Sequence, residues 1–196
     1  MKKVLYIDCC IRRDGSRSRK LADCFLNELT GSREYEIEKI TLMDESLMYM
    51  AEGFFLQRDD LLQNKEWNHP RFRYAHQFVQ ADKVVIAAPF WDLSFPALLK
   101  VYIENLCVEK ITFDCDENGM RGLCTADHMV FITARGSIYS DSHLEMGSRY
   151  MEAMCEFFGI EKYTCITAEG LDLGTRPVDE IMQEAMKEAK TVAKTF

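Results

Sequence analysis

The stretch Val84 to Phe95, with the sequence VVIAAPFWDLSF, decides how the rest of the chain is understood. It begins as an apolar run and breaks at Pro89, after which Phe90, Trp91 and Asp92 follow. A short apolar run that ends at a proline is typical of a buried parallel strand leading into a loop. Ligands of open α/β sheets bind outside the carboxyl ends of the strands. The two aromatic residues indicate either a flat, half-buried ligand or ordinary packing beneath a loop, and this stretch alone leaves both open.

The composition describes a protein that can bury a sizeable core. The chain has 196 residues, of which 47% are hydrophobic, and this length suits one domain covering residues 1–196. A net charge of −8 and a pI near 5.1 argue against nucleic acid or an anionic membrane as a partner. No stretch is apolar for long enough to cross a bilayer, and the polar N-terminus is unlike a signal peptide. We therefore expect a soluble, cytoplasmic protein.

The cysteines give no sign of a metal site. None of the eight cysteines has C-x-x-C spacing, and none lies near histidines in the manner of a zinc knuckle. Several lie inside apolar patterns, where cysteine acts as a small hydrophobic residue. We expect free thiols, as in a reducing cytoplasm, and no bound metal. The adjacent pair Cys9-Cys10 could be a redox switch or a neutral substitution.

Apolar runs alternate with helical patterns along the chain. Short runs predict strands near residues 4–7, 37–42, 84–88, 129–132 and 163–168. Helical spacing predicts helices near residues 18–31, 70–79, 94–106, 144–158 and 177–196, and Ser94 could cap the third of these. Residues 43–64 read as an irregular excursion with a short helix, and Asn118-Gly119 predicts a hairpin. This order predicts an α/β fold, a doubly wound, five-stranded parallel sheet with helices on both faces.

The loop after the first strand contains Ser16-Arg17-Ser18 directly before a helix. Hydroxyl groups and free N–H groups at a positive helix end suit a phosphate, although a plain serine N-cap explains the same residues. Arg17 could pair with that phosphate or lie in solvent. Neither a Walker loop nor a dinucleotide fingerprint is present, so a phosphomonoester fits better than a pyrophosphate.

Two further loops should meet this one at the same edge of the sheet. The loop after the third strand offers Phe90 and Trp91 as flat apolar surface. The loop after the fourth strand contains Gly136, which lets the backbone approach a ligand closely, although a simple turn is the competing explanation. Together the three loops describe a site for a flat ring with a phosphate tail, which is the shape of FMN.

With these residues lined up, the chain resembles the flavodoxin-like NAD(P)H:quinone reductases, and most closely the bacterial FMN-dependent NADH-azoreductases. The resemblance covers nearly the whole length and is strongest over Ala87–Leu93, with Leu99-Lys100 and Tyr102 beyond it. It continues through Thr112-Phe113, Glu117-Asn118-Gly119, Gly122-Leu123, Arg135-Gly136, Ile138 and Ala168-Glu169-Gly170.

The resemblance implies a homodimer with one tightly bound FMN per subunit. It also implies a ping-pong reaction, in which NADH or NADPH delivers two electrons and a quinone, azo compound or similar small-molecule acceptor then takes them. The flavin carries the chemistry at its N5 atom, so no catalytic side chain is required. The alternative is a flavodoxin-type electron carrier or a flavin-binding sensor that acts through a partner protein.

Position by position, the resemblance assigns three groups of residues. Cys10, Ser16, Arg17 and Ser18 would hold the phosphate and ribityl chain, and Phe90, Trp91, Asp92 and Leu93 would line the isoalloxazine ring. Ala134, Arg135, Gly136 and Ser137 would close the other side. The substrate side would be formed by Trp91, Tyr139 and Phe113, where Phe113 reaches across the dimer or is instead a core aromatic.

Three departures from the family pattern are visible. Cys9-Cys10 replaces a serine pair, so that a hydroxyl contact to phosphate becomes a weak thiol donor. Asp92 stands where asparagine is usual, and its charge should lower the reduction potential of the flavin. Ser137 replaces the second glycine of a pair, which is a mild change. His143 is expected to be a surface histidine.

Overall fold

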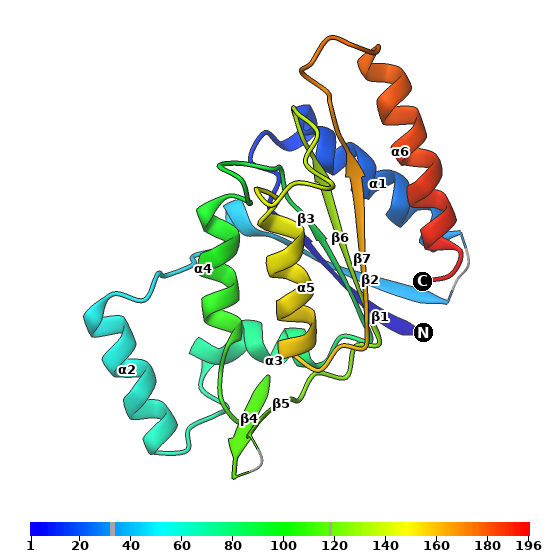
Figure 1. The fold of residues 1–196 in the computed structure, drawn as a ribbon. Coiled ribbons are helices and arrows are strands. Elements are labelled where there is room, and N and C mark those ends of the chain that lie inside the picture. Colours follow the sequence, from blue (N-terminus) through cyan, green and yellow to red (C-terminus); the bar gives the residue numbers. More distant parts are fainter. Residues whose placement is uncertain (32–33, 118) are drawn as a thin grey trace.

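The structure is a computed structural model that describes residues 1–31, 34–117 and 119–196. Its centre is a five-stranded parallel sheet in the order β2-β1-β3-β6-β7 (Figure 1). The strands are β1 (Lys2–Asp8), β2 (Tyr35–Thr41), β3 (Lys83–Ala87), β6 (His128–Ala134) and β7 (Lys162–Ala168). The strand order reverses between β1 and β3, and such switch points are where open sheets bind ligands.

Every residue of β3 is buried, which explains the continuous apolar run in its sequence. A strand covered on both faces has no solvent side and therefore no alternation of polar residues. The parallel register places Ile86 between Ile7 of β1 and Phe131 of β6. The predicted doubly wound sheet is confirmed.

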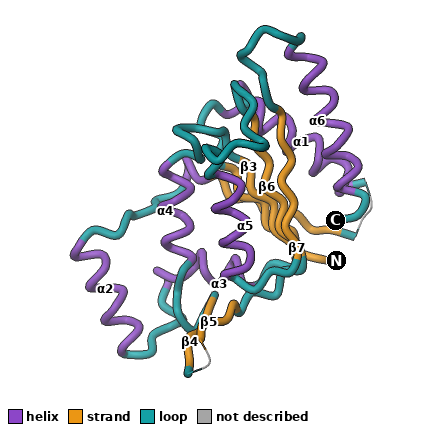
Figure 2. Tube along the Cα trace, viewed as in Figure 1, coloured by secondary structure: helices purple, strands orange, loops and turns teal. Residues whose placement is uncertain are grey.

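Helices cover both faces of the sheet (Figures 1 and 2). One face is covered by α1 (Arg17–Thr30) and α6 (Val178–Ala193), and the other by α3 (Arg73–Val79), α4 (Ala97–Leu106) and α5 (Gly147–Phe157). Successive residues of β1 divide between the two cores, because Tyr6 packs with the α1 and α6 side whereas Ile7 packs with the other. None of the described helices is long and apolar enough to cross a membrane.

A helix and a hairpin are added to the plain alternation of strands and helices. The helix α2 (Glu52–Gln63) lies at the side of the molecule, within the segment predicted to be irregular (Figure 2). The predicted hairpin forms from β4 (Phe113–Asp116) and β5 (Gly119–Gly122), while Asn118 lies outside the described residues. A Cβ at Gly122 would lie 2.0 Å from the backbone carbon of Phe158, so the hairpin can approach the end of α5 this closely only with glycine.

Two predicted helix starts were wrong. Ser94 does not cap α4, since Pro96 occupies the N-cap position and Ser94 instead closes a turn with Trp91. The helix α5 begins at Gly147 and not near Leu144. Its first N–H groups are satisfied by Glu145, whose carboxylate accepts from Ser148 at 2.8 Å, so the chain before it is free to form a loop.

Candidate functional site

A cavity of about 390 Å³ lies where the carboxyl ends of β1, β3 and β6 meet. Its lining contains several residues predicted from the sequence: Ser16, Arg17, Ser18, Phe90, Trp91, Ala134, Arg135 and Gly136. It also contains residues that the sequence reasoning missed: Arg12, Gly15, Pro89, Leu171 and Asp172. The three loops predicted to converge therefore do so.

The first wall of the cavity, residues 12–18, is held by hydrogen bonds within its loop and by one to the opposite wall. Ser16 caps α1, because its Oγ accepts the N–H of Arg19 at 3.3 Å. The Oγ of Ser18 accepts the N–H of Ala134 at 3.0 Å and so joins this wall to the opposite one. The N–H groups of Arg17 and Ser18 belong to the first helical turn, where no intrahelical carbonyl is within reach. This end of the cavity therefore combines N–H donors with the positive end of a helix.

A buried carboxylate lies beneath this wall. Asp8, at the end of β1, has no exposed surface, and its Oδ1 accepts the N–H of Cys10 at 3.0 Å. Lys39 lies 2.9 Å from its other oxygen. Burial and the charge of Asp8 raise the pKa of the Cys9 thiol to about 12, and burial also raises the pKa of Cys10. Both thiols are thus kept protonated, which suits packing better than redox chemistry.

The aromatic loop ends in a tight two-residue turn. Trp91 and Ser94 exchange backbone hydrogen bonds of 3.1 and 2.8 Å, and between them Asp92 and Leu93 have φ values of 49° and 67°. Hairpin turns of this kind prefer asparagine or aspartate followed by glycine, so Asp92 is suited to its position and Leu93 is not. A left-handed conformation costs such a residue about 1–2 kcal/mol. The N–H of Met146 donates to the carbonyl of Leu93 at 3.0 Å and holds the turn in place.

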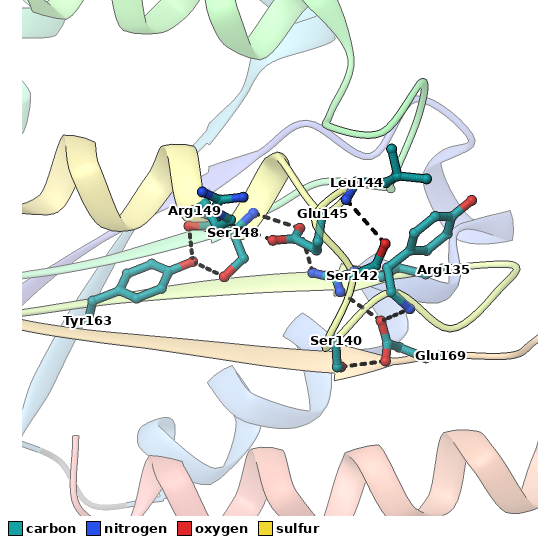
Figure 3. A network of polar contacts seen from close by, with 10 residues as sticks. Arg135, Ser140, Ser142, Leu144, Glu145, Ser148, Arg149, Tyr163 and Glu169 are labelled. Atoms are coloured by element: carbon teal, nitrogen blue, oxygen red, sulfur yellow. Dashed lines mark hydrogen bonds and ion pairs between the residues drawn. The ribbon is translucent and has the colours of Figure 1, made fainter.

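The second wall, residues 134–146, is held by a buried ionic network (Figure 3). Arg135 is only 2% exposed, and its guanidinium donates to Glu169 at 2.7 Å and to Glu145 at 2.9 Å. A Cβ at Gly136 would lie 2.5 Å from a carboxylate oxygen of Asp172, so a larger residue there would push this exposed side chain aside. Asp172, which follows β7 and also lines the cavity, forms an ion pair of 2.8 Å with Arg17 of the first wall.

The remaining predicted residues lie around the cavity or away from it. Cys10, Asp92, Leu93, Ser137 and Tyr139 are outside its lining, although the Tyr139 ring packs on Phe90 with centroids 4.7 Å apart. Phe113 lies at the far end of α5, where its ring packs on Phe157 at 5.0 Å, so the chain does not bring it to its own cavity. His143 is exposed, as expected.

The position of the missed residues after strand ends was visible in the sequence and could have identified them. Arg12 lies in the same loop as Ser16, and Asp172 follows the fifth strand, whose carboxyl end lies at the same edge of the sheet. Extending the strand-end argument to this fifth loop would have included Leu171 and Asp172. Among the described residues, no group of three or more His, Cys, Asp or Glu side chains is placed to hold a metal ion.

Comparison with known proteins gives a consistent result. The family described as "Flavodoxin-like fold" matches residues 2–193. FMN-dependent NADH:quinone oxidoreductase 2 of Clostridium acetobutylicum is 40% identical over the whole of both chains, and an FMN-dependent NADH:quinone oxidoreductase of Clostridium beijerinckii is 39% identical with the same coverage.

Solved structures agree with these sequences. An azoreductase from Bacillus anthracis superposes with a TM-score of 0.90 and 27% identity, with full coverage of both chains. An FMN-dependent NADH-azoreductase from the same species, solved in complex with FMN, gives a TM-score of 0.88 at 27% identity, covering 100% of this chain and 99% of the other. The strand order, the cavity at the switch point and these matches lead to one conclusion: the chain belongs to the flavodoxin-like family.

Proposed function

We propose that the chain is an FMN-dependent oxidoreductase that takes two electrons from NADH or NADPH and passes them to quinones, azo compounds or similar small acceptors. The observation that carries this proposal is the cavity at the β1–β3 switch point, with a helix N-terminus at one end and two aromatic rings at the other. The names of the relatives, FMN-dependent NADH:quinone oxidoreductases and azoreductases, support it.

The residues present fit FMN. Its phosphate suits the first wall, where N–H groups of the first helical turn lie beside the guanidinium groups of Arg12 and Arg17. Its flat ring suits Phe90 and Trp91, and Gly136 leaves room for the ring to approach the second wall. A volume of about 390 Å³ falls within the usual range for small-molecule sites. FMN, when bound, supplies the two-electron redox chemistry.

The protein then has to bind the cofactor, orient it and keep water away from it. Ser16, Arg17 and Ser18 hold the phosphate end, while Phe90, Trp91 and the turn at Asp92 and Leu93 support the ring. Trp91 is 41% exposed, so it offers a planar donor or acceptor an open aromatic face. We propose that donor and acceptor occupy this face in turn, which is a ping-pong order. Cys10 is buried beneath the phosphate end, where its N–H donates to Asp8 at 3.0 Å and supports the loop.

A spectroscopic titration tests the proposal. The purified protein should take up FMN, lose its yellow colour with NADH or NADPH in the absence of oxygen, and recover it when 2-methyl-1,4-naphthoquinone is added. The relative rates with the two nucleotides give the donor preference. A protein that binds FMN but does not react with either nucleotide would be an electron carrier. A protein that stays colourless with FMN would contradict both functions.

The active form is proposed to be a homodimer in the cytoplasm. The arm that contains α2 exposes Tyr49, Phe55 and Leu56, of which Tyr49 is 65% and Leu56 58% exposed. We propose that a second copy covers these side chains and that Phe113 reaches across the dimer toward the partner's site. All eight cysteines are free thiols, as a reducing compartment allows. Sedimentation at micromolar concentration should give a dimer, and Leu56→Glu should shift it toward monomer. A monomeric parent protein would contradict the homodimer.

A further inference from the structure

Arg135, Glu145 and Glu169 form a buried ionic group, called the clamp below (Figure 3). The side chains are 2%, 6% and 12% exposed, and one guanidinium binds both carboxylates. Buried charges in such a group fix geometry strongly, because an unpaired one would be costly. The clamp connects three points of the chain: the residue after β6, the second residue before α5 and the residue after β7.

The two carboxylates also hold the backbone of the second wall. Glu169 accepts the N–H of Tyr139 at 3.0 Å and the hydroxyl of Ser140 at 2.5 Å. Glu145 accepts the N–H of Ser148 at 2.8 Å, which fixes the start of α5. Residues 136–146 are therefore tied at their beginning, middle and end by one set of charges.

The aromatic side of the cavity rests on the same group. The Phe90 ring lies 5.0 Å from the Arg135 guanidinium carbon and 4.7 Å from the Tyr139 ring, measured from ring centroids. Arg135, which contacts Phe90, is thus part of the clamp, and the backbone of Tyr139, which also contacts Phe90, is held by the clamp through Glu169. Phe90 lines the cavity, so a change in the clamp reaches the cavity through this ring.

We propose that Arg135, Glu145 and Glu169 are positioning residues that fix Tyr139, beside Phe90, where the planar donor and acceptor dock. This rests on the proposed function, because it assigns these residues to the substrate side of that site. The guanidinium of Arg135 acts through the two rings and the loop. It is not a phosphate ligand, because two carboxylates already neutralise it. If the loop is already ordered before the substrate binds, binding does not have to supply the free energy of ordering it. KM is lower as a result.

The test uses Glu169→Gln, which keeps the side-chain shape and removes the charge. We expect the KM for NADH and for 2-methyl-1,4-naphthoquinone to rise about tenfold, with kcat and the Kd for FMN changed less than about twofold. In the protein without FMN, the Tyr139 amide should exchange its hydrogen about tenfold faster, while the amides of β1 and β3 stay unchanged. Ser140→Ala, which removes one hydrogen bond to Glu169, should act in the same direction with a smaller effect.

Two further variants separate positioning from general stability. Arg135→Lys keeps the charge but loses the planar fork, so it should give an intermediate KM at normal FMN affinity. Glu184→Gln breaks an exposed bidentate pair between Glu184 of α6 and Arg176, which lies just before that helix. Neither residue lines the cavity, so the variant should change neither KM nor the exchange of residues 136–146.

Three outcomes would overturn the proposal. The first is an unchanged Tyr139 exchange rate in Glu169→Gln, and the second is faster exchange without a rise in KM. The third is a rise in the Kd for FMN equal to the rise in KM, which would make the clamp part of the cofactor site. A parent protein that does not take up FMN would refute the proposed function separately, and the exchange measurement would still decide whether the clamp orders the loop.

Discussion

On the first wall of the cavity the guanidinium groups of Arg12 and Arg17 are within reach of solvent, and Arg17 has only one exposed partner, Asp172, whereas on the second wall Arg135 is buried between Glu145 and Glu169. The first wall is held mainly by hydrogen bonds within its own loop and by one from Ala134 to Ser18, and the second by charges that come from three separate parts of the chain. A cation that is open to solvent can bind an incoming anion, while one that is already neutralised can only hold structure. The same residue type thus has a binding role on one wall and a supporting role on the other.

The largest expected difference is in stability. Arg135→Ala leaves two buried carboxylates without their cation, and we expect it to lower the free energy of unfolding by about 3–5 kcal/mol. Arg17→Ala removes an exposed pair and should cost at most about 1 kcal/mol. Urea unfolding of both variants measures the difference. Equal losses for the two variants would remove the distinction between the walls.

The second expected difference is in ligand affinity. Arg17→Gln should weaken FMN binding about tenfold, roughly 1.4 kcal/mol, because a charge-assisted contact to phosphate is lost. Riboflavin, which has no phosphate, should bind equally to parent and variant. Fluorescence titration with both ligands measures this, and Arg176→Gln, just before α6 and outside the cavity lining, is the matched control. A parallel loss of riboflavin affinity would place Arg17 at the ring and not at the phosphate.

A smaller effect is expected at the turn between the walls. Asp92→Asn removes a negative charge beside the ring site and should raise the midpoint potential of bound FMN by about 20 mV, roughly 1 kcal/mol for a two-electron couple. The effect is modest because Asp92 is exposed and water screens its charge. A spectroelectrochemical titration gives both potentials. An unchanged potential would show that Asp92 acts only on the geometry of the turn.

The smallest effect is a difference in acid sensitivity. Burial would raise the pKa of Glu169, but the hydrogen bonds from Ser140 and Arg135 outweigh it and hold this pKa below its usual value. A carboxylate with a lowered folded pKa stabilises the fold above its unfolded pKa of about 4.3, and this stabilisation is lost as the pH falls through the folded value. Melting temperatures measured from pH 7 to pH 3 should therefore fall less steeply for Glu169→Gln than for the parent. An equally steep fall of the melting temperature in both proteins would contradict a lowered pKa for Glu169.

The sequence predicted the parts that depend on local patterns. The apolar run of β3, the helical spacing of α1 and the position of Ser16 before it need only neighbouring residues, and the structure confirms each. The buried state of Arg135 could not be foreseen, because its partners lie 10 and 34 residues away in a stretch with no repeating pattern. In the sequence, an arginine beside a glycine turn suggests a ligand contact. The structure adds that Glu145 and Glu169 pair with its guanidinium.

The prediction for the turn after Trp91 was wrong for a different reason. Ser94 looked like a helix cap because serine before a proline and an apolar stripe is a common start signal. The backbone there is instead fixed by hydrogen bonds across the turn and by Met146, more than 50 residues away, which overrides the local preference. Leu93 in a left-handed conformation is the kind of exception that only tertiary contacts can enforce.

Leu93 also has a consequence for the evolution and engineering of this chain. A glycine at this position would adopt the same backbone without strain, so the fold with leucine is less stable than a near neighbour in sequence space by about 1 kcal/mol. Selection for heat tolerance would therefore favour that glycine. Because Leu93 lies outside the lining of the cavity, Leu93→Gly is expected to raise thermal stability while leaving the residues that line the cavity in place.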